Sequence, residues 1–130
     1  MKTIDFDVEH SYAPRVRPSI MVRLRTPEAE PSVPAVLDTG AWTSVFNMTV
    51  ADLLGIDDVT TGEPVDLTLA DGRDLIGYSH WVDIRVLDKW MNVRLAFSPD
   101  IPNAPNLLGM RDVFDQMVIA FKHRTHMIYA

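Results

Sequence analysis

Alternation of apolar and polar residues with a period of two is the feature of this 130-residue sequence that most limits its fold. In residues 20–25, isoleucine, valine and leucine alternate with methionine and arginine, which is the pattern of a half-buried strand. Residues 82–86 and 93–97 alternate in the same way, and residues 34–37 are a short apolar run suited to an inner strand. Many short strands separated by turn signals predict a mainly β fold, either a barrel or a sandwich.

Turn signals and short helical segments separate these strands. The string Ala70-Asp71-Gly72-Arg73 contains an Asp-Gly pair and predicts a tight hairpin turn between a strand at 65–69 and a return strand at about 74–78. Residues 49–54, followed by a glycine, predict a short helix. Further predictions are a second helix at 110–117, a connection at 88–91, and a closing hairpin of residues 118–121 and 126–129.

The composition is that of an ordinary globular protein, with 47% hydrophobic and 23% charged residues. We therefore expect one domain over residues 1–130, with residues 1–18 as an N-terminal arm of uncertain structure. The absence of cysteine excludes disulfides, thiolate metal sites and a cysteine nucleophile. No recognisable set of histidine ligands is present, so neither a metal nor a cofactor is expected. Without a signal peptide or an apolar span, we expect a cytoplasmic protein with no membrane partner.

The net charge of −6 argues against nucleic acid as a partner, because nucleic-acid binding depends on neutralising phosphates. Arg15, Arg17, Arg23 and Arg25 nevertheless form a local basic patch. A solvated strand face is the more common explanation of such a patch, although it could also contact an acidic substrate.

The residue most suggestive of chemistry is Asp38, which directly follows the apolar run Ala35-Val36-Leu37 and begins the string Asp38-Thr39-Gly40-Ala41. An aspartate at the end of a buried strand presents its carboxylate from a rigid element, and the glycine lets another backbone or a substrate approach closely. Taken alone, the three letters Asp-Thr-Gly are also a reasonable strand-ending turn.

About 65 residues downstream, Asn106-Leu107-Leu108-Gly109 provides another apolar pair ending in glycine. With this string, the predicted hairpin and residues 111–121, the sequence resembles the retropepsin-like (retroviral-type) aspartic proteases, and in particular their small prokaryotic single-domain members. The resemblance extends from about residue 19 to the C-terminus. It implies an all-β, closed-barrel acid-protease fold with a flap hairpin, one or two short helices and one lobe per chain.

The resemblance also implies roles for individual residues. Asp38 would be the catalytic carboxylate, and Thr39, Gly40 and Ala41 would form the active-site loop, with Thr39 hydrogen-bonding across a subunit boundary. The segment packed beneath this loop would be Leu107, Leu108 and Gly109, and the flap over a bound peptide would be Ala70, Asp71, Gly72 and Arg73. Trp42 stands where many relatives carry an acidic residue, so it is expected to shape a subsite or the core instead of making that residue's substrate contact.

The implied activity is that of an aspartic endopeptidase, in which water is activated between two carboxylates. Because the sequence holds a single Asp-Thr-Gly, the pair requires a homodimer that brings together two copies of Asp38. The terminal segments 1–8 and 126–129 could pair across the dimer interface or form edge strands within one subunit. The alternative function is a catalytically silent module of the same fold that dimerises or binds peptides.

Overall fold

The fold consists mostly of β-strands, as the alternation in the sequence predicts. The computed structural model describes residues 3–12, 17–69 and 71–130. Two residues named above, Arg15 and Ala70, lie outside these described residues. Within them, no helix is both long enough and apolar enough to cross a membrane.

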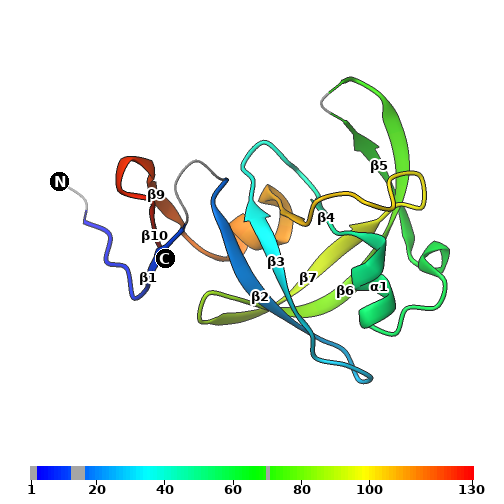
Figure 1. Ribbon diagram of the computed structural model, residues 1–130, viewed down its shortest axis with the longest axis horizontal. Helices are drawn as coiled ribbons and strands as arrows, with labels where there is room; N and C mark the ends of the chain where they lie inside the picture. The colour runs from blue at the N-terminus through cyan, green and yellow to red at the C-terminus, as the bar shows by residue number, and fades with distance from the viewer. Residues whose placement is uncertain (1–2, 13–16, 70) are drawn as a thin grey trace.

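The main body of the molecule is a closed β-barrel (Figure 1). In the described residues its sheet has the strand order β2-β3-β8-β4-β7-β6-β5, and β2 also pairs with β6, so the ring from β2 to β6 closes on itself. Closure removes free edges from the ring and confirms a barrel over a sandwich. The strands are β2 (Ser19–Arg25), β3 (Ser32–Leu37), β4 (Ser44–Val45), β5 (Glu63–Thr68), β6 (Asp74–Val86), β7 (Lys89–Phe97) and β8 (Leu107–Leu108).

The apolar positions of the alternating strands fill the interior of the barrel. Leu24 of β2, Ile84 of β6 and Val93 of β7 are each fully buried, and their neighbours in sequence are more exposed. Burial of each such side chain stabilises the fold by roughly 1.5–3 kcal/mol relative to exposure. The period-two pattern therefore determines which face of each strand forms the core.

Strand β6 is longer than the sequence indicates. Separate strands at 74–78 and 82–86 were expected, whereas the structure has one continuous strand of 13 residues. Its beginning pairs with β5 in a hairpin, its end pairs with β2, and residues 78–86 pair with β7. The predicted connection at 88–91 is also wrong in extent, because the turn is Leu87-Asp88, and Leu87 adopts a positive φ of 58° that allows a two-residue turn.

The first predicted helix is confirmed as α1 (Met48–Leu53). The side chain of Asn47 caps its N-terminus by accepting a hydrogen bond from the amide of Thr49, and Gly55 follows its C-terminus with a φ of 78°. The second helix is shorter and less regular than predicted: the helical segment η2 (Met110–Phe114) contains non-helical backbone at Arg111 and Asp112. An additional short 3₁₀ turn, η1 (Val59–Thr61), was not predicted.

The two termini form a separate small sheet at the end of the molecule opposite the β5–β6 hairpin (Figure 1). The predicted closing hairpin is present as β9 (Ala120–Lys122) and β10 (Met127–Tyr129), joined by η3 (His123–Thr125). In the described residues β10 lies between β9 and an N-terminal strand, β1 (Glu9–Ser11). The terminal strands therefore pair with each other inside one chain.

Asn106 links three parts of the barrel, and its replacement provides a test of how they are held together. Its side-chain Nδ2 donates to the carbonyl of Pro34 at 2.8 Å, and its Oδ1 accepts from the amide of Asn47 at 2.8 Å. We predict that Asn106→Ala lowers the free energy of unfolding by about 1–3 kcal/mol, measured by urea denaturation. Asn103→Ala, at an exposed position nearby, is the control and should change it by less than about 0.5 kcal/mol. Equal unfolding midpoints for both variants would contradict this account.

Candidate active site

Asp38 is the first residue after β3, where β3 runs parallel to β8. Its backbone amide donates to the carbonyl of Leu108 at 2.9 Å, which ties the start of the loop to β8. Its carboxylate Oδ1 accepts a hydrogen bond from the amide of Gly40 at 2.8 Å, and its carbonyl accepts from the amide of Ala41 at 3.2 Å. The loop that begins with Asp38 therefore holds its half-buried carboxylate in a defined orientation.

Gly40 and Thr39 lie next to this carboxylate on the outer side of the loop, and both are exposed. A Cβ atom at Gly40 would lie 3.1 Å from Oδ1 of Asp38, tighter than most real contacts. The glycine therefore leaves room for the carboxylate. The exposed position of Thr39 leaves its side chain available to another molecule.

The segment Leu107, Leu108 and Gly109 lies directly beneath the loop. Leu108 is fully buried, and the amide of Gly109 donates to Oγ of Ser44 at 2.9 Å. The amide of Met110 then donates to the carbonyl of Ala41 at 2.8 Å. The structure thus brings together two strings that are about 70 residues apart in the sequence. Ser44 was not singled out from the sequence, because nothing in the string around it indicates that this serine is buried.

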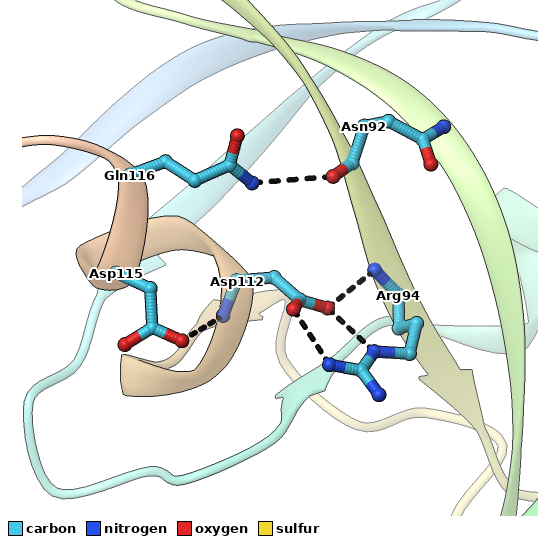
Figure 2. A network of polar contacts seen from close by, with 5 residues as sticks. All are labelled: Asn92, Arg94, Asp112, Asp115 and Gln116. Atoms are coloured by element: carbon cyan, nitrogen blue, oxygen red, sulfur yellow. Dashed lines mark hydrogen bonds and ion pairs between the residues drawn. The ribbon is translucent and has the colours of Figure 1, made fainter.

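A partly buried ion pair fixes the chain that follows Gly109 (Figure 2). The carboxylate of Asp112 accepts hydrogen bonds from Arg94 at its backbone amide (2.9 Å), Nε (2.8 Å) and Nη2 (2.7 Å). Their side chains are only 12% and 22% exposed, respectively. Hydrogen bonds from Arg94 lower the pKa of Asp112, and the same contacts raise the pKa of Arg94.

This ion pair explains why the predicted helix at 110–117 is irregular. Asp112 has a positive φ of 72°, which a non-glycine residue rarely adopts, and its backbone amide donates to the carboxylate of Asp115 at 3.1 Å. Gln116 donates to the carbonyl of Asn92 on β7, beside Arg94. These side-chain contacts with β7 compensate for the strained backbone and anchor η2 against the barrel.

A groove of about 820 Å³ opens beside Asp38. The loop from Gly40 to Thr43 forms one wall, and the β5–β6 hairpin forms another through Asp66, Leu67 and Thr68. Arg17 and the loop residues Ala104 and Pro105 complete the lining, together with Val45, Leu69, Ile101 and Leu107. A groove between a carboxylate and a hairpin can hold an extended chain next to the carboxylate.

The described residues of the predicted flap turn, Asp71, Gly72 and Arg73, lie at the tip of the hairpin and do not line this groove. Asp71 accepts hydrogen bonds from the amide and Nε of Arg73, at 3.0 and 2.8 Å, and these bonds lower the pKa of Asp71. Gly72 supplies the positive φ of 88° that the turn requires. The part of the hairpin that lines the groove is instead residues 66–69. Sequence analysis missed them because an alternating strand does not reveal which of its faces meets a distant loop.

Trp42 is 65% exposed and lines the groove. Trp42 was expected either to shape a subsite or to pack in the core. Its exposure excludes the core, and its place in the groove wall supports a role in shaping a subsite. Its indole gives the groove an apolar surface close to Asp38, while Arg17 and Asp66 introduce charges of opposite sign.

Gly109 offers a test of the contact beneath the loop. A Cβ atom there would lie 2.8 Å from the carbonyl oxygen of Ala41 and 2.9 Å from backbone atoms of Trp42 and Thr43. Because these neighbours are backbone atoms, the loop must move to accommodate any side chain. We predict that Gly109→Ala lowers the free energy of unfolding by about 1–3 kcal/mol, measured by urea denaturation.

The matched control for Gly109→Ala is Gly40→Ala, which meets the Asp38 side chain and no backbone. Its effect on stability should be the smaller of the two. A Gly109→Ala variant as stable as the unmodified protein would show that the loop and β8 are not tightly packed.

The ion pair predicts a pH-dependent contribution to stability. Because the pKa of Asp112 is lower in the folded protein than in the unfolded chain, its stabilising effect is present at neutral pH and is lost as pH falls below about 4. We predict that Asp112→Asn lowers the free energy of unfolding by about 2–4 kcal/mol at pH 7. The difference from the unmodified protein should shrink in acid, as measured by urea denaturation at several pH values. A difference that is constant with pH would contradict the charged pairing.

Comparison with known proteins agrees with this fold and with the position of the site. The family model described as gag-polyprotein putative aspartyl protease matches residues 29–113, from the loop before β3 into η2. No curated protein matches the sequence. Among solved structures, the EIAV protease complexed with the inhibitor HBY-793 superimposes with a TM-score of 0.60 at 19% identity, over 82% of this chain and 93% of that chain. That likeness supports the retroviral-protease fold, and the match to the family model covers most of the barrel. The chain therefore belongs to the gag-polyprotein aspartyl protease family, with the retropepsin-like fold that its sequence resembles.

Proposed function

We propose that this protein is an aspartic endopeptidase that acts as a homodimer through two copies of Asp38. The observation that carries the proposal is the place of the Asp38 carboxylate, which is fixed by its own loop and lines a groove bounded by a hairpin. Family and fold are those of aspartic proteases and support the same activity.

The chemistry requires a second carboxylate. One ionised carboxylate removes a proton from water as the water attacks the peptide carbonyl, and a protonated partner donates to the carbonyl oxygen. Two carboxylates at hydrogen-bond distance do not both ionise readily, so the pair keeps one proton over a range of pH. This shared proton lets the two groups act as base and acid in the same step.

The second carboxylate comes from a second chain in this proposal. The 130 residues contain one Asp-Thr-Gly. The other carboxylate in the described groove lining, Asp66, belongs to the wall formed by β5 and not to the loop of Asp38. Gly40 and the side of the loop at Thr39 are exposed, which leaves a surface against which the same loop of another molecule can pack. A twofold axis at this surface would bring the two Asp38 side chains together.

The groove favours a peptide in an extended conformation as substrate. Strand β5 pairs only with β6 in the described residues, so its other edge is open to pairing with an extended chain, and residues 66–68 of this strand line the groove. Trp42 and Leu69 supply apolar contacts for side chains. Arg17 and Asp66 provide charges that can distinguish substrates by the sign of their own side chains.

The activity is tested by Asp38→Asn, which keeps the shape of the side chain but removes the base. We predict that cleavage of a peptide library falls to background, while the circular dichroism spectrum and sedimentation coefficient stay unchanged. Asp57→Asn, an exposed aspartate outside the groove, is the control and should leave cleavage intact.

Cleavage by Asp38→Asn at the unmodified rate would contradict the proposal. If the unmodified protein binds peptides in the groove but cleaves none at any pH from acid to neutral, the protein is the silent binding module of the same fold.

A further inference from the structure

One outer face of the barrel is unusual in an acidic protein, because it gathers exposed tryptophans and arginines. These side chains occupy alternate positions of three paired strands and therefore point the same way, away from the core. We call this surface the Arg/Trp face, and none of its residues lines the groove beside Asp38. Its members are Met21, Arg23 and Arg25 of β2, Trp81, Asp83 and Arg85 of β6, and Trp90, Asn92 and Arg94 of β7.

Two arginines on this face stand directly opposite each other. Arg23 of β2 and Arg85 of β6 are register partners in the antiparallel pairing that closes the barrel. Like charges at directly opposite positions destabilise a sheet. Neither residue forms an ion pair within the described part of the chain. An anionic group seated between them would convert this repulsion into two attractive contacts.

A third guanidinium lies beside this pair, and its position is fixed. Arg25 lies over the ring of Trp90, 4.1 Å from its centroid, and 3.9 Å from the carboxylate of Asp83. Asp83 also accepts a hydrogen bond from Nδ2 of Asn92 at 3.0 Å. Asp83 is the one carboxylate that this face sets against the three arginines Arg23, Arg25 and Arg85. Three positive charges and one negative charge leave an excess of about two positive charges. The whole chain, in contrast, has a net charge of −6.

The aromatic side chains of the face are exposed well beyond what packing requires. Trp81 is 60% exposed and lies under the guanidinium of Arg94, whose carbon is 4.9 Å from the ring centroid. Trp90 and Met21 are also exposed. Tryptophan, arginine and methionine are the residue types enriched at the centres of protein interfaces.

We propose that the Arg/Trp face is a docking surface for an acidic segment of a partner protein. Aspartate or glutamate side chains of the partner would bind Arg23 and Arg85, since guanidinium and carboxylate form paired hydrogen bonds. Apolar side chains of the same segment would rest on Trp81, Trp90 and Met21. Charge complementarity selects this partner, because the excess charge on the face is positive while the rest of the chain is strongly acidic.

Nucleic acid fits the same face less well. The face carries an excess of only about two positive charges, whereas the affinity of a nucleic-acid site depends on neutralising several phosphates. A polyanion would also meet the negative charge of the remaining surface.

The three tryptophans provide a direct test by nuclear magnetic resonance. The probe is a short peptide that alternates glutamate with phenylalanine, and the comparison peptide has glutamine in place of glutamate. We expect the glutamate peptide, and not the glutamine peptide, to shift the indole signals of Trp81 and Trp90, which lie on the face. A shift of Trp42, which lies in the groove, reports binding at that separate site. Using the inactive Asp38→Asn protein prevents cleavage of the probe, and the readout does not depend on protease activity.

Variants then assign the binding to the paired arginines. Arg23→Gln/Arg85→Gln should weaken binding of the glutamate peptide about tenfold or more, since each lost contact to a charged group contributes substantially. Lys122→Ala/Arg124→Ala, which removes two exposed charges from the terminal sheet, should leave binding unchanged. Because the paired arginines repel each other, Arg85→Gln alone should raise the melting temperature.

Several outcomes would overturn the proposal. These are equal binding of the glutamate and glutamine peptides, shifts confined to Trp42, tighter binding of single-stranded oligothymidine than of the glutamate peptide, and a lower melting temperature for Arg85→Gln. Self-association of the protein that disappears in Arg23→Gln/Arg85→Gln would also overturn it, because the occupant would then be a second copy of this chain.

Discussion

The close contact between Gly109 and the loop after Asp38 is the constraint on which the rest of the site depends. The loop leaves β3 and cannot fix its own position, since Thr39 and Gly40 are exposed and the hydrogen bonds accepted by the carboxylate and carbonyl of Asp38 come from within the loop. Position comes from the chain about 70 residues later, whose backbone lies so near that a single methyl group at Gly109 would collide with three loop residues. The retropepsin-like barrel can be understood as the framework that brings these two segments together and holds them there.

Two polar contacts outside the Asp-Thr-Gly string support this arrangement. Ser44 receives the amide of Gly109 within the core, and the Arg94–Asp112 pair fixes η2 against β7 just after the contact. In both contacts the polar side chains have hydrogen-bond partners, so they add rigidity without leaving a buried polar group unpaired. The tip of the hairpin opposite is held by hydrogen bonds of its own, between Asp71 and Arg73, and the hydrogen bonds of its described residues reach no other element.

Local sequence patterns were sufficient for much of the fold and insufficient for contacts between distant segments. Alternation predicted the strands and the buried faces, and the Asp-Gly pair predicted the hairpin turn. The length of β6 was underestimated because the partners that extend it, β2, β5 and β7, come from three different parts of the chain. The positive φ of Asp112, the burial of Ser44 and the groove-facing side of β5 follow from tertiary packing, and no neighbouring residue signals them. The roles of Asp38, Thr39 and the flap residues remain predictions, since the structure gives their positions and not their activity.

The central claim is that one active site is made by two chains, and a mixing experiment tests it most directly. Inactive Asp38→Asn protein is added in increasing proportion to the unmodified protein, total concentration is kept constant, and the rate of peptide cleavage is measured after subunits have exchanged. If both carboxylates of a dimer are required, the rate falls as the square of the fraction of unmodified chains, because mixed dimers are inactive. A rate that falls in direct proportion to that fraction would show that each chain carries a complete site, and would contradict the shared pair.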